Sequence, residues 1–293
     1  MRWWGFGDAP IFPVNETPFC PHQMVTLQEI LSPSFKDYGV SLPTGRPVVL
    51  DLWQRCWSLE NQFCKAVVDC GYLSYEQMAC AAIRYRVGTS KNGGVIFWQI
   101  DHEERIHDGK VVYYEPDCHR SKQKALHPTW VSALLARRCR WPDKHQGLHC
   151  LFGLHLLNSH PAPLMGRGCL SESKPPIAIV EAEKTAFILS ELYPNYLWLA
   201  SGGLSELQPY KFRPLRGRRI ILFPDTDPDG TAFRRWHQVA DEVMRSIFWE
   251  DCPPIRVSAI LEQRATAEQK ALKIDLVDFI FTNGTRRDEG MKT

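Results

Sequence analysis

The C-terminal half of the sequence alternates short strand-like runs with helical runs, and this alternation restricts the fold more than any other feature. The strand-like runs are residues 177–181, 196–200, 219–223 and 255–260. They are short and almost wholly apolar, as expected of strands that are buried on both faces. Between them lie segments with helical spacing of apolar residues, of which residues 231–248 are the longest. Strands and helices in this order indicate an α/β fold with a mostly parallel sheet flanked by helices.

The preceding segment has a different pattern. Residues 58–71 and 73–88 favour two short helices, and Ser74 and Gln77 have the spacing of a capping box at the start of the second. Residues 93–101 and 109–116 are β-branched and aromatic runs around a polar turn that ends in Asp108-Gly109, so they predict a hairpin. Helical spacing returns at residues 129–138. The sequence therefore predicts a smaller α+β unit before the α/β domain.

Pro, Gly and Ser accumulate between residues 160 and 176, as is typical of a linker. We therefore expect residues 170–285 to fold alone as an α/β domain. The predicted organisation is a Pro-rich irregular segment at 1–57, an α+β subdomain at 58–160, a linker at 161–175, an α/β domain at 176–282 and a tail at 283–293.

Composition narrows the function classes. The 35 Lys and Arg residues nearly cancel the 33 Asp and Glu residues, so any nucleic-acid surface must be a local patch. No run approaches the ~18 apolar residues of a membrane span and the N-terminus lacks a signal-peptide pattern, so we expect a soluble cytoplasmic protein with no membrane partner. The ten cysteines contain no C-x2-C pair, which disfavours zinc and favours reduced thiols.

Acidic residues follow two of the predicted strands. Glu181 ends the first, and Asp225, Asp227 and Asp229 follow the third, just before Gly230. The carboxyl ends of parallel strands share one edge of a sheet, and ligands bind outside that edge. Oxygen ligands without nearby His or Cys favour Mg²⁺ or Mn²⁺. The four acids are therefore candidate ligands of a divalent cation, and the alternate spacing predicts that Asp225 and Asp227 point the same way.

These residues also have a plain structural interpretation. Asp, Pro and Gly are ordinary turn formers, and Asp229-Gly230 can cap the helix that follows. Turn chemistry does not predict an acid at the end of a separate strand, so Glu181 favours the metal interpretation. Glu183 is expected to interact with the dipole of the next helix. Lys184 is either a phosphate-neutralising group or a solvated lysine at a helix start.

Basic residues flank the acidic strand. A basic border around an acidic centre suits a polyanionic substrate such as single-stranded DNA. A solvated loop explains the same run equally well. The candidate nucleic-acid-binding residues are Lys211, Arg213, Arg216, Arg218 and Arg219 before the strand, and Arg234 and Arg235 after it.

Taken together, these motifs resemble the Toprim domain, which bacterial-type primases, type IA and type II topoisomerases, and OLD-type and recombination-repair nucleases share. The resemblance rests on Glu181, the turn in "ASGGLSEL" and the D-x-D-x-x-G run from Asp225 to Gly230, and it covers about residues 176–282. "VEAEKTA" and "ILFPDTDPDG" are most similar to primase-related Toprim proteins of bacterial mobile elements. The upstream hairpin is similar in character to the strand pair that precedes Toprim in primases.

The resemblance implies phosphoryl chemistry that depends on Mg²⁺ or Mn²⁺. Glu181 corresponds to the general acid/base, with Lys184 as a further catalytic candidate, and Asp225 and Asp227 correspond to the metal-binding pair. Asp229 corresponds to a position that is acidic in topoisomerases. The implied substrates are nucleotides and single-stranded DNA, and a helicase or another replication protein is an implied partner. Three functions stay open: a primase-like nucleotidyltransferase serving a plasmid or mobile element, a Toprim nuclease, and a DNA-binding replication or mobilisation protein with a vestigial site.

Overall fold

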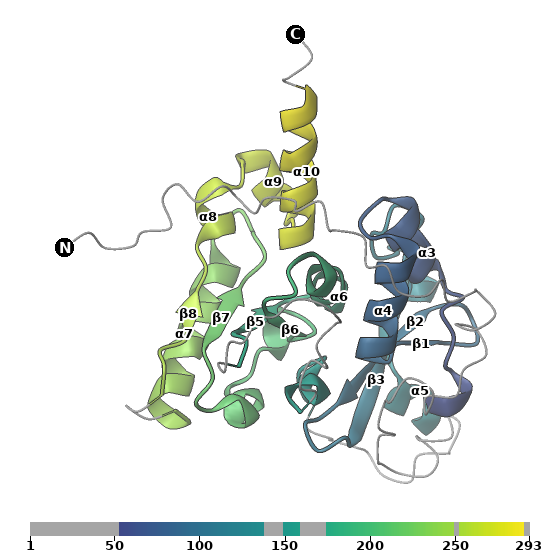
Figure 1. Ribbon diagram of the computed structural model, residues 1–293, viewed down its shortest axis with the longest axis horizontal. Coiled ribbons are helices and arrows are strands. Elements are labelled where there is room, and N and C mark those ends of the chain that lie inside the picture. The colour runs from purple at the N-terminus through teal and green to yellow at the C-terminus, as the bar shows by residue number, and fades with distance from the viewer. Residues whose placement is uncertain (1–52, 138–148, 159–173, 249–251, 290–293) are drawn as a thin grey trace.

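The computed structural model describes residues 53–137, 149–158, 174–248 and 252–289, which form two four-stranded sheets with helices around them (Figure 1). One sheet is antiparallel, in the order β1-β2-β3-β4, and the other is parallel, in the order β6-β5-β7-β8. The predicted α/β class is confirmed, while the narrower Toprim assignment stays a prediction. None of the helices in these ranges is long and apolar enough to cross a membrane.

The antiparallel sheet and its helices form the upstream half. Its strands are β1 (Gly88–Thr89), β2 (Val95–Ile100), β3 (Ile106–Val112) and β4 (Thr129–Trp130). Its helices are α3 (Gln62–Asp69), α4 (Tyr75–Tyr85) and α5 (Val131–Ala136), with a 3-10 turn, η2, at Lys124–Leu126. Helix α4 begins with the predicted capping box, in which the Ser74 hydroxyl accepts from the Gln77 N–H and the Gln77 side chain accepts from the Ser74 N–H.

The hairpin turn lies earlier than the sequence predicts. β2 ends at Ile100 and β3 begins at Ile106, so Asp108-Gly109 lies inside β3. Asp101 makes the turn, since its Oδ1 accepts the N–H groups of Glu103 (2.9 Å) and Arg105 (3.0 Å). Gly109 is required for packing instead, because it pairs with Trp98 and a Cβ at its position would lie 2.7 Å from the Trp98 ring.

The parallel sheet contains the four predicted strands, β5 (Ile177–Val180), β6 (Leu197–Ala200), β7 (Ile220–Phe223) and β8 (Arg256–Val257). The predicted helices are α6 (Glu183–Leu192), α7 (Thr231–Ser246) and α10 (Leu276–Glu289), the last of which runs past the predicted domain end at residue 282. The short helices α8 (Ile260–Arg264) and α9 (Ala267–Leu272) were not predicted. Three 3-10 segments complete this half: η3 (Leu154–Leu157), η4 (Leu204–Glu206) and η5 (Pro209–Leu215).

The two faces of the parallel sheet pack against different helices. Ala178 and Val180 share a core with α6, whereas Ile177 and Ile179 share one with α7. Successive residues of a strand point to opposite faces, which explains this division. Helix α7 begins after Gly230, whose φ of 63° lets the chain turn into the helix as predicted.

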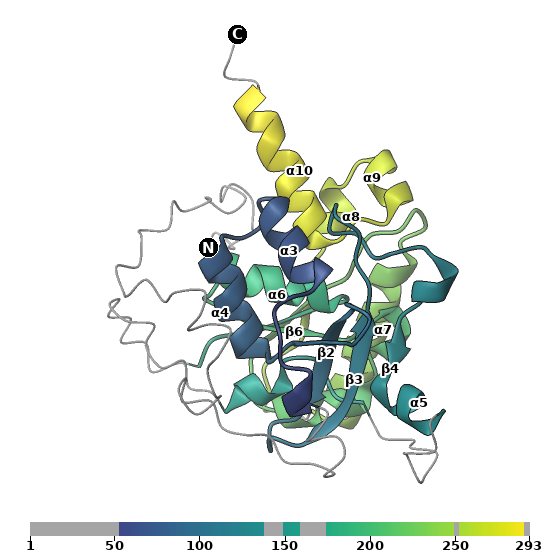
Figure 2. The ribbon, with the colours of Figure 1, turned by 90° about the vertical axis from the view of Figure 1, so that its right-hand side faces the viewer.

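One hydrophobic core extends across both sheets. The hydroxyl of Tyr85 on α4 donates to the carbonyl of Trp198 on β6 at 2.8 Å. Phe63 on α3 packs edge-on against Phe187 on α6, with ring centroids 5.2 Å apart. Figure 2 shows α3 and α4 beside α6 and the base of α10. The expectation that residues 170–285 fold alone conflicts with this packing, because the fragment would expose its half of the shared core.

Two predicted segments lie largely outside the described residues. The Pro-rich segment at 1–57 is described only from residue 53, and the linker at 161–175 only from residue 174. The division of the chain into the predicted domains therefore stays a prediction.

Candidate functional site

Glu181 and Asp225 lie at the carboxyl edge of the parallel sheet, as predicted. Val180 pairs with Phe223 across β5 and β7, so Glu181 follows one strand end and Asp225 lies two residues beyond the other. Both acids are partly buried. Burial raises the pKa of Asp225 well above its usual range, and the negative charge of Glu181 raises it further. The two carboxyl groups are therefore close enough to repel each other.

Two acids that the sequence prediction missed approach the same point from the start of α10. Asp275 is buried, and its charge also raises the pKa of Asp225. Burial raises the pKa of Asp278, and the charge of Asp275 adds to this rise. The two aspartates cap the helix reciprocally: the Asp278 N–H donates to Asp275 (2.9 Å), and the Asp275 N–H donates to Asp278 (3.3 Å). This spacing of acids at a helix start is the sequence signal that was overlooked.

The four acids Glu181, Asp225, Asp275 and Asp278 form what we name the acidic cluster. Lys184, on α6, neutralises part of its charge. Its Nζ lies 3.0 Å from Asp275 Oδ2 and 3.4 Å from Asp278 Oδ1, and its side chain is 8% exposed. Burial opposes its charge, but the carboxylates of Asp275 and Asp278 outweigh burial and raise the pKa of Lys184. The alternative of a solvated lysine is therefore wrong. One ammonium group among four carboxyl groups leaves the cluster with excess negative charge when they are ionised.

Asp227 serves helix α7. Its Oδ1 accepts the N–H groups of Asp229 (3.0 Å) and Thr231 (2.9 Å), and its Oδ2 accepts that of Ala232 (2.7 Å). Burial opposes its ionisation, but these hydrogen bonds outweigh burial and lower the pKa of Asp227. Asp225 and Asp227 thus do not share an orientation: Asp227 faces the start of α7, whereas Asp225 faces the acidic cluster. A metal-binding role for Asp227 stays a prediction.

The residues that follow Asp227 lie at the surface. Asp229 is exposed, and its backbone carbonyl accepts a hydrogen bond from Arg234 Nη1 at 2.6 Å. Arg234 and Arg235 are exposed on the first turns of α7, which begins at the same carboxyl edge of the sheet as the acids. The structure places Asp229 and these two arginines near the predicted edge but does not join them to the acidic cluster.

Two of the other predicted arginines, Arg218 and Arg219, lie at the opposite edge of the sheet. The Arg219 carbonyl accepts the N–H of Ile177, the first residue of β5, at 2.8 Å. Arg218 donates to the carbonyl of Pro175 at 2.8 Å. Arg219 lies roughly 13 Å from Phe223 at the other end of β7, at about 3.3 Å per residue, and Asp225 lies two residues beyond that end. The predicted basic border around the acids is therefore wrong for Arg218 and Arg219, whereas a role for the exposed Arg213 and Arg216, in and directly after η5, stays a prediction.

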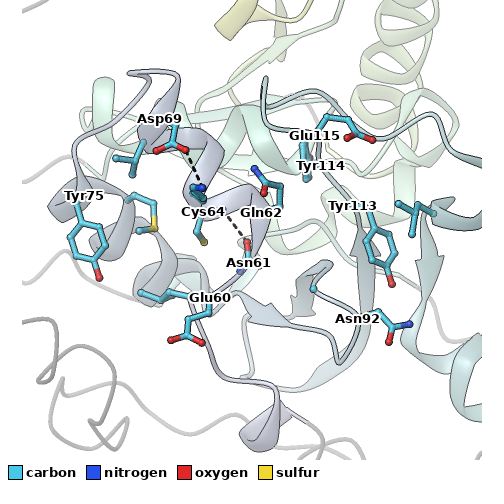
Figure 3. Close-up of a pocket in the computed structure, with 16 residues that line it drawn as sticks. Glu60, Asn61, Gln62, Cys64, Asp69, Tyr75, Asn92, Tyr113, Tyr114 and Glu115 are labelled. Atoms are coloured by element: carbon cyan, nitrogen blue, oxygen red, sulfur yellow. Dashed lines mark hydrogen bonds and ion pairs between the residues drawn. The ribbon is translucent and has the colours of Figure 1, made fainter.

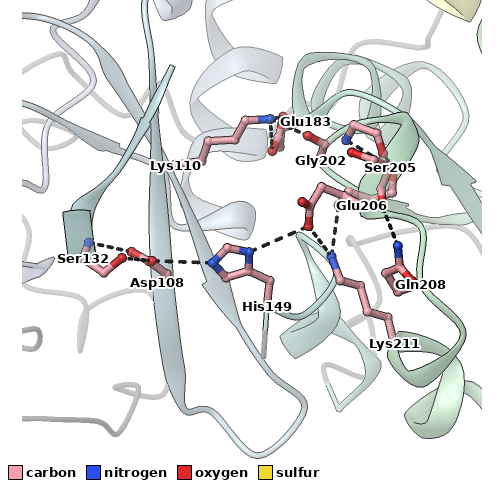
Figure 4. A network of polar contacts seen from close by, with 12 residues as sticks. Asp108, Lys110, Ser132, His149, Glu183, Gly202, Ser205, Glu206, Gln208 and Lys211 are labelled. Atoms are coloured by element: carbon pink, nitrogen blue, oxygen red, sulfur yellow. Dashed lines mark hydrogen bonds and ion pairs between the residues drawn. The ribbon is translucent and has the colours of Figure 1, made fainter. Parts of the chain in front are cut away.

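Lys211 belongs to a separate polar network between the two sheets (Figure 4). Its Nζ lies 3.1 Å from Glu206 Oε2, and its side chain is fully buried. In the same network His149 lies between Glu206 (3.8 Å) and Asp108 (3.7 Å). Since these contacts join η4 to β3, Lys211 occupies a structural position where it cannot meet a phosphate without leaving Glu206.

Glu183 also contacts the upstream sheet (Figure 4). The Nζ of Lys110 on β3 lies 3.0 Å from Glu183 Oε1 and 2.7 Å from the carbonyl oxygen of Gly202. Glu183 is 4% exposed, so a buried ion pair accompanies the dipole interaction that the sequence predicts. This pair brings β3 to the start of α6, beside Glu181.

Basic groups reach the acidic edge from the upstream sheet. Burial raises the pKa of Glu181, while the Leu204 N–H and the cations of Arg120 and Lys110 oppose this rise. Arg120 lies on a turn after β3 that is closed by the hydrogen bond from the Ser121 N–H to the Tyr113 carbonyl (2.8 Å). We name residues 119–127 the basic segment; its exposed basic residues are His119, Arg120, Lys122, Lys124 and His127. Its composition was the overlooked sequence signal.

The oxygen donors of Glu181 and Asp225 fit a hard divalent cation. Within the described residues, the carboxyl group of Asp225 makes no hydrogen bond that we observe, which leaves its oxygens available. In the parts of the chain that the structure describes, no three His, Cys, Asp or Glu side chains are arranged to hold a metal by themselves. Mg²⁺ commonly takes only one or two protein carboxylates and completes its shell with water and substrate phosphate. Glu181 and Asp225 form a donor set of this size.

Comparison with known proteins gives a family match and loose structural similarity to solved structures. A family model described as "Domain of unknown function (DUF6371)" matches residues 61–226, which include the antiparallel sheet and β5, β6 and β7. The structure described as "Crystal Structure of the primase fragment of Bacteriophage T7 primase-helicase protein" is 15% identical, with 72% of this chain and 69% of that chain covered and a TM-score of 0.40. At this TM-score the similarity supports no conclusion about function. No curated protein matches the chain.

Proposed function

The chain belongs to the family described as Domain of unknown function (DUF6371), and we propose that it catalyses metal-dependent phosphoryl transfer on single-stranded nucleic acid, as a primase-like nucleotidyltransferase. The observation that carries this proposal is the pair Glu181 and Asp225, which follow neighbouring parallel strands and repel each other. A bound cation relieves such repulsion, and phosphoryl transfer is the chemistry that two carboxylates and Mg²⁺ commonly support.

The residues of the acidic cluster divide the chemistry between them. When bound, Mg²⁺ or Mn²⁺ supplies positive charge that stabilises the transferring phosphoryl oxygens. Asp225 holds the cation, since its carboxylate receives no competing hydrogen bond. Glu181, whose pKa burial raises, accepts a proton from the attacking hydroxyl. Lys184 compensates part of the charge of Asp275 and Asp278, so that the substrate meets fewer uncompensated charges.

The basic segment supplies a surface for the polyanion. A nucleic acid cannot approach four carboxylates without compensating cations, and the charge of Arg120 already acts on Glu181. His119 also acts on the acidic cluster, since it opposes in small part the rise that burial and Asp275 cause in the pKa of Asp278. Lys122 and Lys124 extend the exposed positive charge away from the acids. We therefore place the path of the nucleic acid along residues 119–127.

The role of Asp227 favours a second candidate function, a nucleic-acid-binding protein without catalysis. Its two oxygens already accept three backbone N–H groups at the start of α7. If catalysis requires a third carboxylate on the metal, Glu181 and Asp225 are not sufficient. The basic segment would then bind nucleic acid without any catalysis.

An incubation with Mg²⁺ or Mn²⁺, labelled nucleotides and single-stranded DNA separates these functions. Extended products support nucleotidyl transfer, shortened DNA indicates a nuclease instead, and binding without either product supports the second candidate. Asp225→Asn should lower metal-dependent product formation by at least about 100-fold, the scale of losing one electrostatic transition-state contact. Asp229→Asn, an exposed aspartate outside the acidic cluster, is the matched control. Unchanged activity in Asp225→Asn would contradict the proposal.

A binding experiment tests the path. Arg120→Ala with Lys122→Ala should flatten the slope of log affinity against log salt by about 1.4, since each lost single-strand phosphate contact removes about 0.7. Arg218→Ala with Arg219→Ala removes the same charge from the opposite edge of the sheet and should leave the slope unchanged. The reverse result would place the nucleic acid on the residues that the sequence alone suggested.

A further inference from the structure

A cavity of about 620 Å³ lies in the upstream half of the molecule (Figure 3). It is bordered by α3, the start of α4, the turn at Asn92-Gly93 and the residues that follow β3. Its volume falls within the range of small-molecule binding sites. Of the lining residues only the apolar Leu126 belongs to the basic segment, and none of them has a charged role in the proposed phosphoryl chemistry, so the cavity requires its own explanation.

The walls of the cavity are aromatic and aliphatic. Tyr75 and Tyr113 lie on opposite sides of it, and Tyr114, Met78 and Val68 line it as well (Figure 3). Met78 is 3% exposed, so its position is fixed by the core behind it. Such a lining favours a ligand with an apolar body, and tyrosine faces also attract cations through their ring quadrupoles.

The charged groups that line the cavity are mainly acidic. Glu60, Asp69 and Glu115 contribute carboxylates, and Lys65 contributes the ammonium group. The Lys65 Nζ lies 3.9 Å from Asp69 Oδ2, so these two charges largely offset each other. Glu60 and Glu115 then leave two negative charges. This charge disfavours phosphate-bearing ligands and favours a cation.

We propose that the cavity binds a small organic cation, in which an ammonium or guanidinium group is joined to an aromatic or aliphatic body. The body occupies the space between Tyr75 and Tyr113, and the negative charges of Glu60 and Glu115, at separate borders of the cavity, attract the cation (Figure 3). This inference is independent of the proposed phosphoryl transfer, because neither the acidic cluster nor the exposed cations of the basic segment line the cavity.

Calorimetric titration with three probes that share a phenyl body tests the proposal. The probes are phenethylamine, phenethyl alcohol and phenylacetate, which differ mainly in charge. The amine should bind most tightly, with a Kd of about 1 mM for so small a molecule. The alcohol should bind more weakly, and the carboxylate at least about tenfold more weakly than the amine.

Two sets of variants locate the binding. Glu60→Gln with Glu115→Gln should reduce the affinity for the amine to that for the alcohol and leave the alcohol unchanged. Glu242→Gln, an exposed acid on α7, is the control and should change neither. Val68→Trp should fill the cavity and weaken the amine and the alcohol together. Circular dichroism of each variant establishes that the fold is retained.

Three outcomes would overturn the proposal. Equal affinity for the three probes would exclude a cation-selective site. Equal loss in Glu242→Gln and in the Glu60/Glu115 double variant would show a general surface effect. Absence of amine binding at millimolar concentration would exclude the site itself. None of these readouts depends on catalysis, so they do not change if the proposed phosphoryl transfer fails.

Discussion

The two sheets surround their acids in opposite ways. In the antiparallel sheet, Asp108 accepts hydrogen bonds from the Gly109 N–H (2.7 Å), the Ser132 N–H (3.0 Å) and the Ser132 hydroxyl. At the carboxyl edge of the parallel sheet, Glu181 and Asp225 approach each other instead. The first arrangement satisfies a carboxylate with hydrogen bonds, and the second leaves two carboxyl groups that repel each other until a cation binds. The partners of an acid, more than its burial, thus separate a structural acid from a candidate catalytic one.

The pKa shifts of two aspartates show the same contrast. Burial opposes ionisation of Asp101, but hydrogen bonds from His107, Arg105 and Glu103 outweigh burial and lower its pKa to about 2. Burial raises the pKa of Asp225, and no hydrogen bond compensates. Both residues belong to turns at strand ends, so the difference arises from the groups that surround each carboxylate.

The largest expected effect is on the ion pair that joins α6 to α10. Lys184→Met leaves the buried Asp275 and Asp278 without their cation, and removing one partner of a buried pair typically costs about 3–5 kcal/mol. Urea unfolding of the variant measures this loss. Lys184→Arg keeps the charge and should lose less. A loss below about 1 kcal/mol in Lys184→Met would mean that the acidic cluster is stable without its cation. The acids of the two sheets would then not differ in their need for a partner.

The next effect concerns the saturated acid of the antiparallel sheet. Asp108→Ala leaves two buried N–H groups and a hydroxyl without their acceptor, so we expect a loss of about 2–3 kcal/mol in the free energy of unfolding. Ser132→Ala removes only the hydroxyl bond and should lose about 1 kcal/mol. Equal losses in the two variants would show that the backbone hydrogen bonds to Asp108 contribute little.

A smaller effect depends on pH. The pKa of Asp101 is lowered to about 2 in the folded protein, against about 3.9 in an unfolded chain. Its contribution of about 1–2 kcal/mol is therefore present above about pH 4 and is lost as the pH falls toward 2. Unfolding of the wild type and Asp101→Asn across this range isolates it, because the variant lacks this part of the pH dependence. Parallel curves would contradict the prediction.

The smallest effect on stability is expected at Asp225. A carboxyl group whose folded pKa is raised destabilises the fold when it ionises, so Asp225→Asn should leave stability unchanged or raise it by at most about 1 kcal/mol, or about 2 °C in Tm. Mg²⁺ should raise the Tm of the wild type and not that of the variant. Thermal melts with and without Mg²⁺ measure both. A clear loss of stability in Asp225→Asn would make Asp225 a structural acid like Asp108.

The sequence by itself determined the features that depend on local chemistry. Apolar runs and helical spacing predict the strands β5 to β8 and the helices α6, α7 and α10, because burial of side chains follows the period of each element. The capping box at Ser74 and the turn at Gly230 follow from single residues and their neighbours. Glu181 and Asp225 were placed together because residues after parallel strands share one edge.

Only the tertiary structure decided which charges meet. Asp227 carries the same carboxyl group as Asp225, yet it accepts backbone N–H groups at the start of α7 and therefore caps that helix. Asp-Gly at 108–109 is a turn signal, yet the Trp98 ring across the strand gives Gly109 a packing role. Arg219 precedes β7 and so lies at the edge away from the acids, whereas Arg120 reaches Glu181 through the packing of two sheets. Such encounters join residues far apart in the chain, and local propensity contains no information about them.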